Sequence, residues 1–220
     1  HQIAINTLWF AVATTLASVA VAIPVAHALE KYDLRGEGLL LTLVSFPISL
    51  PGIVAAFMIL VLFGKVGIVS EFLAILAGGD PREIAFATTV QGLFLAFCYS
   101  MIPRSTLLLR GAYAEVDERA EEAAQSLGAT PLSSFRTVTL PQIWPGIVGA
   151  LILTFRTALA IFGTLIVIQS LVVWTLQISR ELGPGGYNLR VASAMAVLFF
   201  VFTFAFTALA LRYTSAEVGI

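Results

Sequence analysis

The residues of this chain that could do chemistry in water are gathered in one polar stretch, 115–141, which reads EVDERAEEAAQSLGATPLSSFRTVTLP. The stretch lies between long apolar runs and is rich in residues that favour a helix. It holds acids, hydroxyls and two arginines, but no nucleophile spaced for activation by a neighbouring base. A polar helical segment in this setting predicts contact with a partner in water, not a reaction. The alternative is an amphipathic loop that only covers the inner ends of the chain's own helices.

Elsewhere the side-chain groupings that catalysis or metal binding requires are missing. His1 and His27 are isolated, and no two histidines or carboxylates share a ligand spacing inside the apolar runs. Cys98 is the one cysteine, so neither a disulfide framework nor a cysteine metal site is available. The G-x4-G-K-[ST] phosphate loop is also absent from the sequence. The sequence predicts no catalytic residue, no metal and no cofactor in this chain.

The polar stretch itself predicts a helix–turn–helix. Its first helix, 116–127, carries one apolar stripe at helical spacing. The stripe consists of Val116, Ala120, Ala123, Ala124 and Leu127. Gly128 follows as a glycine able to take positive φ at the helix end. Thr130 then offers an N-cap oxygen and Pro131 suits the first helical position, so a second short helix is expected over 132–138, ending before Leu140 and Pro141.

The surroundings of this stretch are those of a membrane protein. Of the 220 residues 59% are hydrophobic and only 11% charged, and the mean hydropathy is +0.95. Soluble domains carry about 25% charged residues, so the composition indicates an integral membrane protein. The formal net charge is −1 and no basic patch with interleaved aromatics occurs, which excludes a nucleic-acid partner.

Five segments are long and apolar enough to cross a bilayer as helices, and they predict an all-α fold in a single domain over 1–220. They are 5–28, 39–63, 84–103, 142–163 and 191–212. The apolar run 145–178 is too long for one crossing, and we expect one span ending near Gly163 and an apolar, partly buried outer segment over 164–182. The alternative is a sixth crossing at 164–180, which would reverse the side of the C-terminus.

The distribution of lysine and arginine assigns the sides under the positive-inside rule. With five spans, one face carries Lys31, Arg35, Arg104, Arg110, Arg119, Arg136 and Arg212, and the other carries Lys65, Arg82, Arg180 and Arg190. The face with more basic residues holds 115–141, which places that stretch and the C-terminus in the cytoplasm and the N-terminus outside. The first residue is His1, which suggests that upstream residues are missing, and the sequence does not tell whether these include another spanning helix.

Polar and helix-breaking residues in the second and fourth spans mark a candidate translocation path. Pro47 and Pro51 predict a kink in the second span. The kink is either purely structural, which we favour, or part of a flexible pore-lining helix with Ser45 and Ser49 on neighbouring turns. The fourth span offers Thr154, Arg156 and Thr157. A charge at mid-membrane is expected inside the bundle, where Arg156 either braces the fold through backbone carbonyls, which we favour, or lines the path. The first span, uniformly apolar after Thr15 except for Ser18 and His27, is expected to be peripheral.

The polar stretch also carries a recognisable signature. Glu122-Ala123-Ala124, three residues, Gly128, nine residues, Val138, one residue and Leu140-Pro141 resembles the EAA loop of permease subunits of bacterial binding-protein-dependent ABC importers. Val138 for isoleucine is the only departure from that signature. The wider resemblance extends over about 7–212 and is in the style of molybdate, sulfate, polyamine and iron permeases. Ile161 stands where many such chains carry an acidic residue before Phe-Gly, which argues against the molybdate and sulfate branch.

The resemblance implies a type I ABC importer permease in the bacterial inner membrane, paired with a second permease subunit, identical or homologous. It also implies two cytoplasmic ATPase subunits, which would bind ATP and Mg, and a periplasmic or lipid-anchored substrate-binding protein. Carried over, the ATPase contact would fall on 119–141. Its residues would be Arg119, Glu122, Ala123, Ala124, Gly128, Val138, Leu140 and Pro141.

Three functions compete on the sequence. As a permease, the chain would be a non-catalytic subunit. A secondary transporter or channel would require intramembrane acids as an ion relay, and the five expected spans contain no Asp or Glu. A membrane-embedded enzyme would require a nucleophile and a base. The sequence does not choose among polyamine, iron, phosphonate and oxyanion substrates, nor between a homodimer and a heterodimer.

Overall fold

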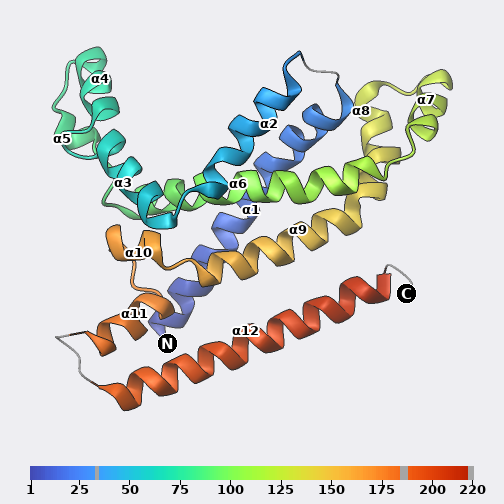
Figure 1. Ribbon diagram of the computed structural model, residues 1–220. Helices are drawn as coiled ribbons and strands as arrows, with labels where there is room; N and C mark the ends of the chain where they lie inside the picture. Colours follow the sequence, from blue (N-terminus) through green and yellow to red (C-terminus); the bar gives the residue numbers. More distant parts are fainter. Residues whose placement is uncertain (33–34, 184–187, 218–220) are drawn as a thin grey trace.

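The computed structural model describes residues 1–32, 35–183 and 188–217, and all regular structure in this part of the chain is helical (Figure 1). Five helical segments are long and apolar enough to cross a membrane. They are α1 (Gln2–Lys31), Gly52–Ala77, α6 (Val90–Ala114), Pro131–Ala160, which includes α9 (Leu140–Ala160), and Leu189–Ala210 within α12 (Leu189–Glu217). The prediction of an all-α protein with five spans is confirmed.

The second span is broken, not merely kinked. It consists of α2 (Glu37–Ser45), the 3-10 turn η1 (Phe46–Ser49) and α3 (Gly52–Phe63), and Leu50 between them is extended with φ −86° and ψ 131°. A residue before a proline is driven out of the helical region, and Pro51 follows Leu50 directly. The predicted continuous helix 39–63 is therefore wrong. Within this region, the part that is long and apolar enough to cross a membrane is Gly52–Ala77, which begins after the break and joins α3 to α4 (Ile68–Ala77).

The third span is displaced toward the C-terminus from the predicted 84–103. The short helix α5 (Pro81–Ile84) ends before it, and α6 runs through Pro103 to Ala114. Pro103 is buried inside α6. A proline within a membrane helix is tolerated where neighbouring helices cover it, so it does not end the helix here. Arg104 and Arg110 consequently both lie within α6 and not in a loop.

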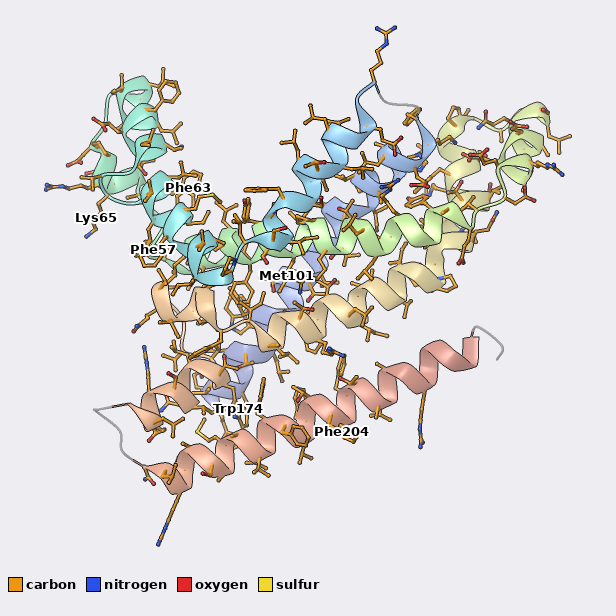
Figure 2. All side chains as sticks on the ribbon, in the orientation of Figure 1. Phe57, Phe63, Lys65, Met101, Trp174 and Phe204 are labelled. Atoms are coloured by element: carbon orange, nitrogen blue, oxygen red, sulfur yellow. The ribbon has the colours of Figure 1, made fainter. Side chains whose placement is uncertain are left out.

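Residues 164–180 do not form the sixth crossing that the sequence left open as an alternative. The region instead folds as two short helices, α10 (Gly163–Val167) and α11 (Trp174–Leu182), which fits the expected outer segment. The Trp174 backbone N–H donates to Thr7 Oγ1 of α1 at 2.9 Å, and its indole Nε1–H donates to the Met195 carbonyl of α12 at 2.9 Å. In Figure 2, Trp174 accordingly lies between α11 and α12.

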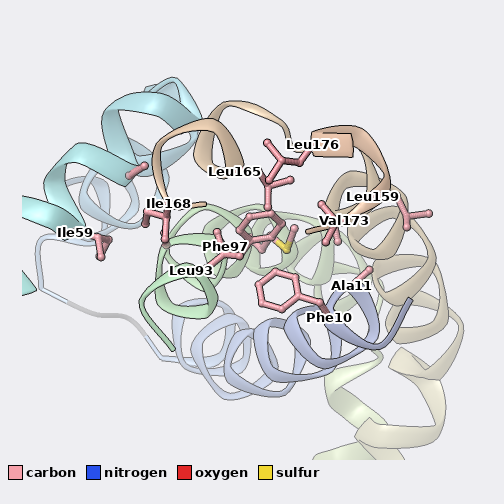
Figure 3. Packing of buried hydrophobic residues seen from close by; sticks show 14 of the residues in the cluster. Phe10, Ala11, Ile59, Leu93, Phe97, Leu159, Leu165, Ile168, Val173 and Leu176 are labelled. Atoms are coloured by element: carbon pink, nitrogen blue, oxygen red, sulfur yellow. The ribbon is translucent and has the colours of Figure 1, made fainter. Parts of the chain in front are cut away.

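The core is formed where α1 packs against α6 and α9. Toward the N-terminus of α1 the rings of Phe10 and Phe97 meet edge to face with centroids 5.1 Å apart, and Leu93 and Leu159 lie around them (Figure 3). Ser18 of α1 is fully buried. The expectation that the first span is peripheral is therefore wrong, and α12 is the least buried of the candidate spans. Apolar side chains along a helix do not reveal whether protein or lipid surrounds them.

The helices alternate in direction and define two ends of the bundle. The C-terminal end of α1, helix α7 (Glu118–Ser126) and the start of α9 lie at one end, called here the loop end (Figure 1). The N-terminus and the helices α4, α5, α10 and α11 lie toward the other, called here the outer end.

The close approach of α6 and α9 generates a stability prediction. A Cβ at Gly146 would overlap with the Cβ of Ala112, whereas a Cβ at Gly149 of the same helix would meet open space. We expect Gly146→Ala to lower the free energy of unfolding by about 1–3 kcal/mol through overpacking. The matched Gly149→Ala is expected to be neutral or to stabilise by about 0.5–1 kcal/mol through helix propensity. Thermal unfolding in detergent measures both variants, and equal midpoints would contradict the close contact between Gly146 and Ala112.

Candidate functional site

The polar stretch forms the predicted helical hairpin at the loop end. Its first helix, α7, begins two residues later than predicted because Asp117 acts as the N-cap and accepts from the Arg119 N–H at 3.0 Å. The Asp117 N–H in turn donates to Gln142 Oε1 of α9 at 3.0 Å, which ties the start of α7 to the bundle. Asp117 thus caps α7 and also attaches the start of this helix to α9.

The turn after α7 requires a glycine. Gly128 has φ +95°, a conformation that side chains with a Cβ rarely adopt. The Gly128 N–H donates to the Gln125 carbonyl at 2.9 Å, and the Ala129 N–H donates to the Ala124 carbonyl at 3.0 Å. This pair of hydrogen bonds is the Schellman motif that ends helices with a left-handed residue. The predicted role of Gly128 as a helix-ending glycine with positive φ is confirmed.

The second helix of the hairpin starts as predicted but continues past its predicted end. Thr130 Oγ1 accepts from the Ser133 N–H at 3.3 Å and Pro131 opens α8 (Pro131–Ser134). The chain then passes through one π turn, η2 (Phe135–Thr139), directly into α9. The predicted end before Leu140 and Pro141 is wrong, because the wider π turn accommodates a proline that a regular turn would crowd.

Polar contacts help to hold α7 to the bundle. Glu121, only 7% exposed, forms an ion pair with Lys31 at the end of α1. The Ser134 hydroxyl donates to the Glu121 carbonyl at 3.4 Å.

Of the apolar stripe, Val116, Ala120 and Ala124 are partly buried on the side of the bundle. Ala123 is exposed, Leu127 is 90% exposed, and Leu132 of α8 is exposed as well. The hairpin therefore presents an uncovered apolar ridge away from its own bundle.

The signature residues fall on this hairpin and on its continuation into α9. Arg119, Glu122, Ala123, Gly128 and Pro141 are exposed, whereas Ala124, Val138 and Leu140 are partly buried. The structure therefore brings together at the loop end the positions that the sequence singled out, and leaves most of them open to water.

The path candidates of the second span lie around its break. Ser49 and Pro51 are exposed, while Pro47 is buried. Ser45 is partly buried and donates to the Leu41 carbonyl of its own helix at 2.6 Å. Figure 1 shows α6 between α2 and α9, so the candidates of the second and fourth spans form separate groups.

The three candidates of the fourth span differ in their surroundings. Thr154 is buried and shares a 2.8 Å hydrogen bond with Ser105 of α6. Thr157 donates to the Leu153 carbonyl of its own helix at 2.9 Å. Arg156 is exposed and has no ion-pair partner in the described part of the chain. It lines a groove of about 330 Å³ with residues of α12, so its expected burial within this bundle is wrong.

Two features of the region were not foreseen. The break before α3 packs against the start of α10: Thr164 Oγ1 donates to the Gly52 carbonyl at 3.0 Å, and a Cβ on Gly163 would lie 3.1 Å from the Ile53 nitrogen. The glycines Gly52 and Gly163 are a signal of close approach, but no pattern in the sequence pairs their two segments.

The second feature lies at the loop end, where Arg110 Nε donates to Glu30 at 2.8 Å.

Comparison with known proteins agrees with this architecture. The family described as "Binding-protein-dependent transport system inner membrane component" matches residues 18–215. The match covers most of the chain, which therefore belongs to this family of membrane transport components.

Among similar proteins, a molybdenum transport system permease of Haemophilus influenzae is 32% identical over 76% of this chain and 71% of its own length. A probable molybdenum ABC transporter permease of Haloferax volcanii is 32% identical over 73% of this chain and 56% of its own. A sulfate transport system permease of Salmonella typhimurium is 32% identical over 70% and 53%. The chain spans about half the length of the last two. Ile161 therefore does not separate this chain from the molybdate and sulfate branch.

Solved structures show the same fold. A bacterial ABC transporter that imports the acidic polysaccharide alginate superposes with TM-score 0.82 at 18% identity, over 98% of this chain and 78% of that one. The methionine ABC transporter in an inward-facing conformation gives TM-score 0.69 at 20% identity, over 96% and 92%. At these identities the likeness establishes the fold. The chain is a multi-pass membrane protein with the fold of type I ABC importer permeases.

The ion pair that docks α7 generates a prediction about local stability. Lys31→Met leaves the buried Glu121 carboxylate unpaired, and the partly exposed position of Lys31 moderates the cost. We expect amide hydrogen exchange within α7 to accelerate about tenfold, which corresponds to roughly 1.4 kcal/mol.

Two controls accompany this measurement. Lys65→Met, at an exposed lysine of the outer end, should leave exchange in α7 unchanged. Lys31→Met combined with Glu121→Leu should restore protection, because no buried charge remains. Unchanged exchange in Lys31→Met itself would show that the ion pair does not hold the helix.

Proposed function

We propose that this chain is the permease subunit of an ABC importer and that its 115–141 hairpin transmits the force of a cytoplasmic ATPase. The observation that carries the proposal is the exposed apolar ridge of α7 and α8, which includes Leu127 and Leu132. The left-handed turn at Gly128 joins the two helices, and the Lys31–Glu121 ion pair holds α7 to the bundle. Small side chains such as Ala123 permit a partner to approach closely, and Leu127 offers apolar area to bury. Family membership supports this assignment.

The assembly proposed with it has two permease subunits, two ATPase subunits and a periplasmic or lipid-anchored binding protein, in the bacterial inner membrane. ATP and Mg would bind on the ATPase chains, and this chain would be non-catalytic. One similar solved structure is the bacterial alginate ABC transporter in complex with an alginate-bound periplasmic protein, which supports a binding-protein partner. The excess of basic residues at the loop end supports a cytoplasmic position for the hairpin.

Replacement of Gly128 tests the hairpin. Gly128→Val forces a β-branched residue to φ +95° at a cost of about 1–2 kcal/mol, and so misdirects α7. We expect both ATPase co-purification and transport to fall while membrane insertion persists. Gly128→Asn serves as the control, since asparagine tolerates the left-handed region and should retain most of both activities. Normal assembly and transport by Gly128→Val would overturn the assignment.

We further propose that the translocation path lies between two permease subunits and is lined by the second and fourth spans. In the single chain Ser49 and Arg156 are exposed and Thr157 is partly exposed. This exposure supports their place on a surface that a second subunit would cover. A path that alternates access also requires helices that bend, and the second span is already interrupted beside Ser49. The relatives include molybdenum, sulfate and thiamine permeases, so molybdate and sulfate are the first substrates to assay.

Bulky substitutions test the path. Ser49→Leu and Thr157→Leu should each reduce transport severalfold in the assembled complex while basal ATP hydrolysis persists, because the added volume narrows the path and removes a hydroxyl. Ser193→Leu, at an exposed serine of α12, is the matched control and should transport normally. Ser18 is not a suitable control, because it is fully buried. Equal losses at Ser49 and Ser193 would sink the assignment of the path.

A further inference from the structure

A groove of about 330 Å³ between α9 and α12 contains a charged side chain that nothing in the described structure neutralises. Helix α9 contributes Arg156 and Ala160, both exposed, and α12 contributes three phenylalanines and two threonines. Arg156 makes no hydrogen bond or ion pair within the part of the chain that the structure describes. A charge inside the membrane is costly where it faces lipid, so the groove requires a neutralising partner.

The depth of the groove is set by a contact between α6 and α9. Ser105 and Thr154 share a 2.8 Å hydrogen bond, which puts these two positions at one level. Arg104 is the neighbour of Ser105 and Arg156 lies two residues beyond Thr154, so the chain carries two arginines near this level. No Asp or Glu occurs in the membrane helices around them, over 2–29, 52–63, 90–114, 140–160 and 189–210. The electrostatic potential at this depth is therefore positive.

The same facts indicate what neutralises Arg156. A second copy of this chain cannot do so from its own membrane helices, because these also lack acids. The groove residues of α12 lie roughly three turns from either end of that helix. A lipid phosphate lies at the bilayer surface, so this depth suits an anion in transit and not a lipid headgroup.

The polar contacts in the groove suit brief binding. Thr203 Oγ1 donates to the Phe199 carbonyl at 2.9 Å, and Thr207 Oγ1 donates to the Thr203 carbonyl at 2.7 Å. Because both hydroxyl protons are used within α12, the Arg156 guanidinium is the side chain of the groove with free donors. A single charged contact attracts an anion without holding it tightly, as a site that the ion must also leave requires.

We propose that Arg156 makes the path selective for anions, so that the substrate of this chain carries an oxyanion or carboxylate group and no net positive charge. The two arginines repel a cation such as a polyamine and concentrate an anion beside them. The inference rests on the proposed function, because an anion in transit requires a translocation path. It identifies Arg156 as a specificity-determining residue of that path.

Single-cysteine labelling of the groove tests this charge preference. Ala160→Cys in a Cys98→Ala chain places a thiol in the groove that Arg156 lines, and the chain is purified in lipid nanodiscs with the subunits that it assembles with. The measurement is the ratio of labelling rates for anionic sulfonatoethyl methanethiosulfonate and cationic trimethylammonioethyl methanethiosulfonate. Arg156→Gln should lower this ratio about tenfold, and Arg156→Lys should retain it, because lysine keeps the charge. Arg190→Gln, at an exposed arginine near the outer end of α12, is the matched control and should leave the ratio unchanged.

Added anions identify the occupant. Sulfate should slow the labelling of Ala160→Cys relative to chloride at equal ionic strength, and this protection should be lost in Arg156→Gln. A ratio unchanged by Arg156→Gln, or a thiol that reacts with neither reagent because the groove is closed to water, overturns the proposal. Protection by phosphatidylglycerol but not by sulfate would assign the groove to a lipid phosphate and overturns it as well. Absence of a co-purifying ATPase would contradict the proposed function instead, and the labelling ratio would still decide the anion preference.

Discussion

The close packing of α1 against α6 and α9 is the contact on which the rest of the chain depends. Between membrane helices lipid supplies little hydrophobic driving force, so close approach through small residues contributes much of the stability. Ala22 and Ala26 of α1 are fully buried toward the loop end, and Gly146 of α9 lies against Ala112 of α6. The other elements then attach to this unit: α3 and η1 pack on α6, and α11 and α12 pack on α1 and α9.

The loop end combines a firm attachment with an open surface. The Lys31–Glu121 pair holds α7 from behind, while Leu127 and Leu132 remain uncovered. The hairpin continues through the π turn into α9 without a flexible linker. Displacement of α7 would therefore be carried into a membrane-spanning helix and, through Lys31, into α1. This connection suits a segment that passes force from a partner in water to the helices of the bilayer.

The outer half of the bundle is built around interrupted helices. A break in a membrane helix frees backbone carbonyls that lipid cannot satisfy, so the break must be covered. The start of α10 packs on the first turn of α3 beside the break, where Thr164 adds a hydrogen bond from its hydroxyl to the Gly52 carbonyl at 3.0 Å. The glycines Gly52 and Gly163 make this contact close enough.

The sequence alone determined the features that depend on neighbouring residues. The all-α membrane class, the positive φ of Gly128, the Thr130 cap and the helical start at Pro131 all follow from local torsional preferences and composition. The signature of the hairpin likewise indicated the family that the comparisons established. The predicted end at Pro141, by contrast, was overturned by the helix that continues past it.

Tertiary structure decided everything that depends on which surfaces meet. Lys31 and Glu121 are 90 residues apart in the sequence, and no local pattern pairs them. The apolar composition of α1 suits lipid and protein equally well, so its central position emerged only from packing. Pro103 and Pro51 are the same residue type in apolar runs, yet α6 continues through one and the second span breaks at the other. The physical reason is that a backbone preference of a few kcal/mol is local, whereas the contacts that outweigh it come from helices distant in the sequence.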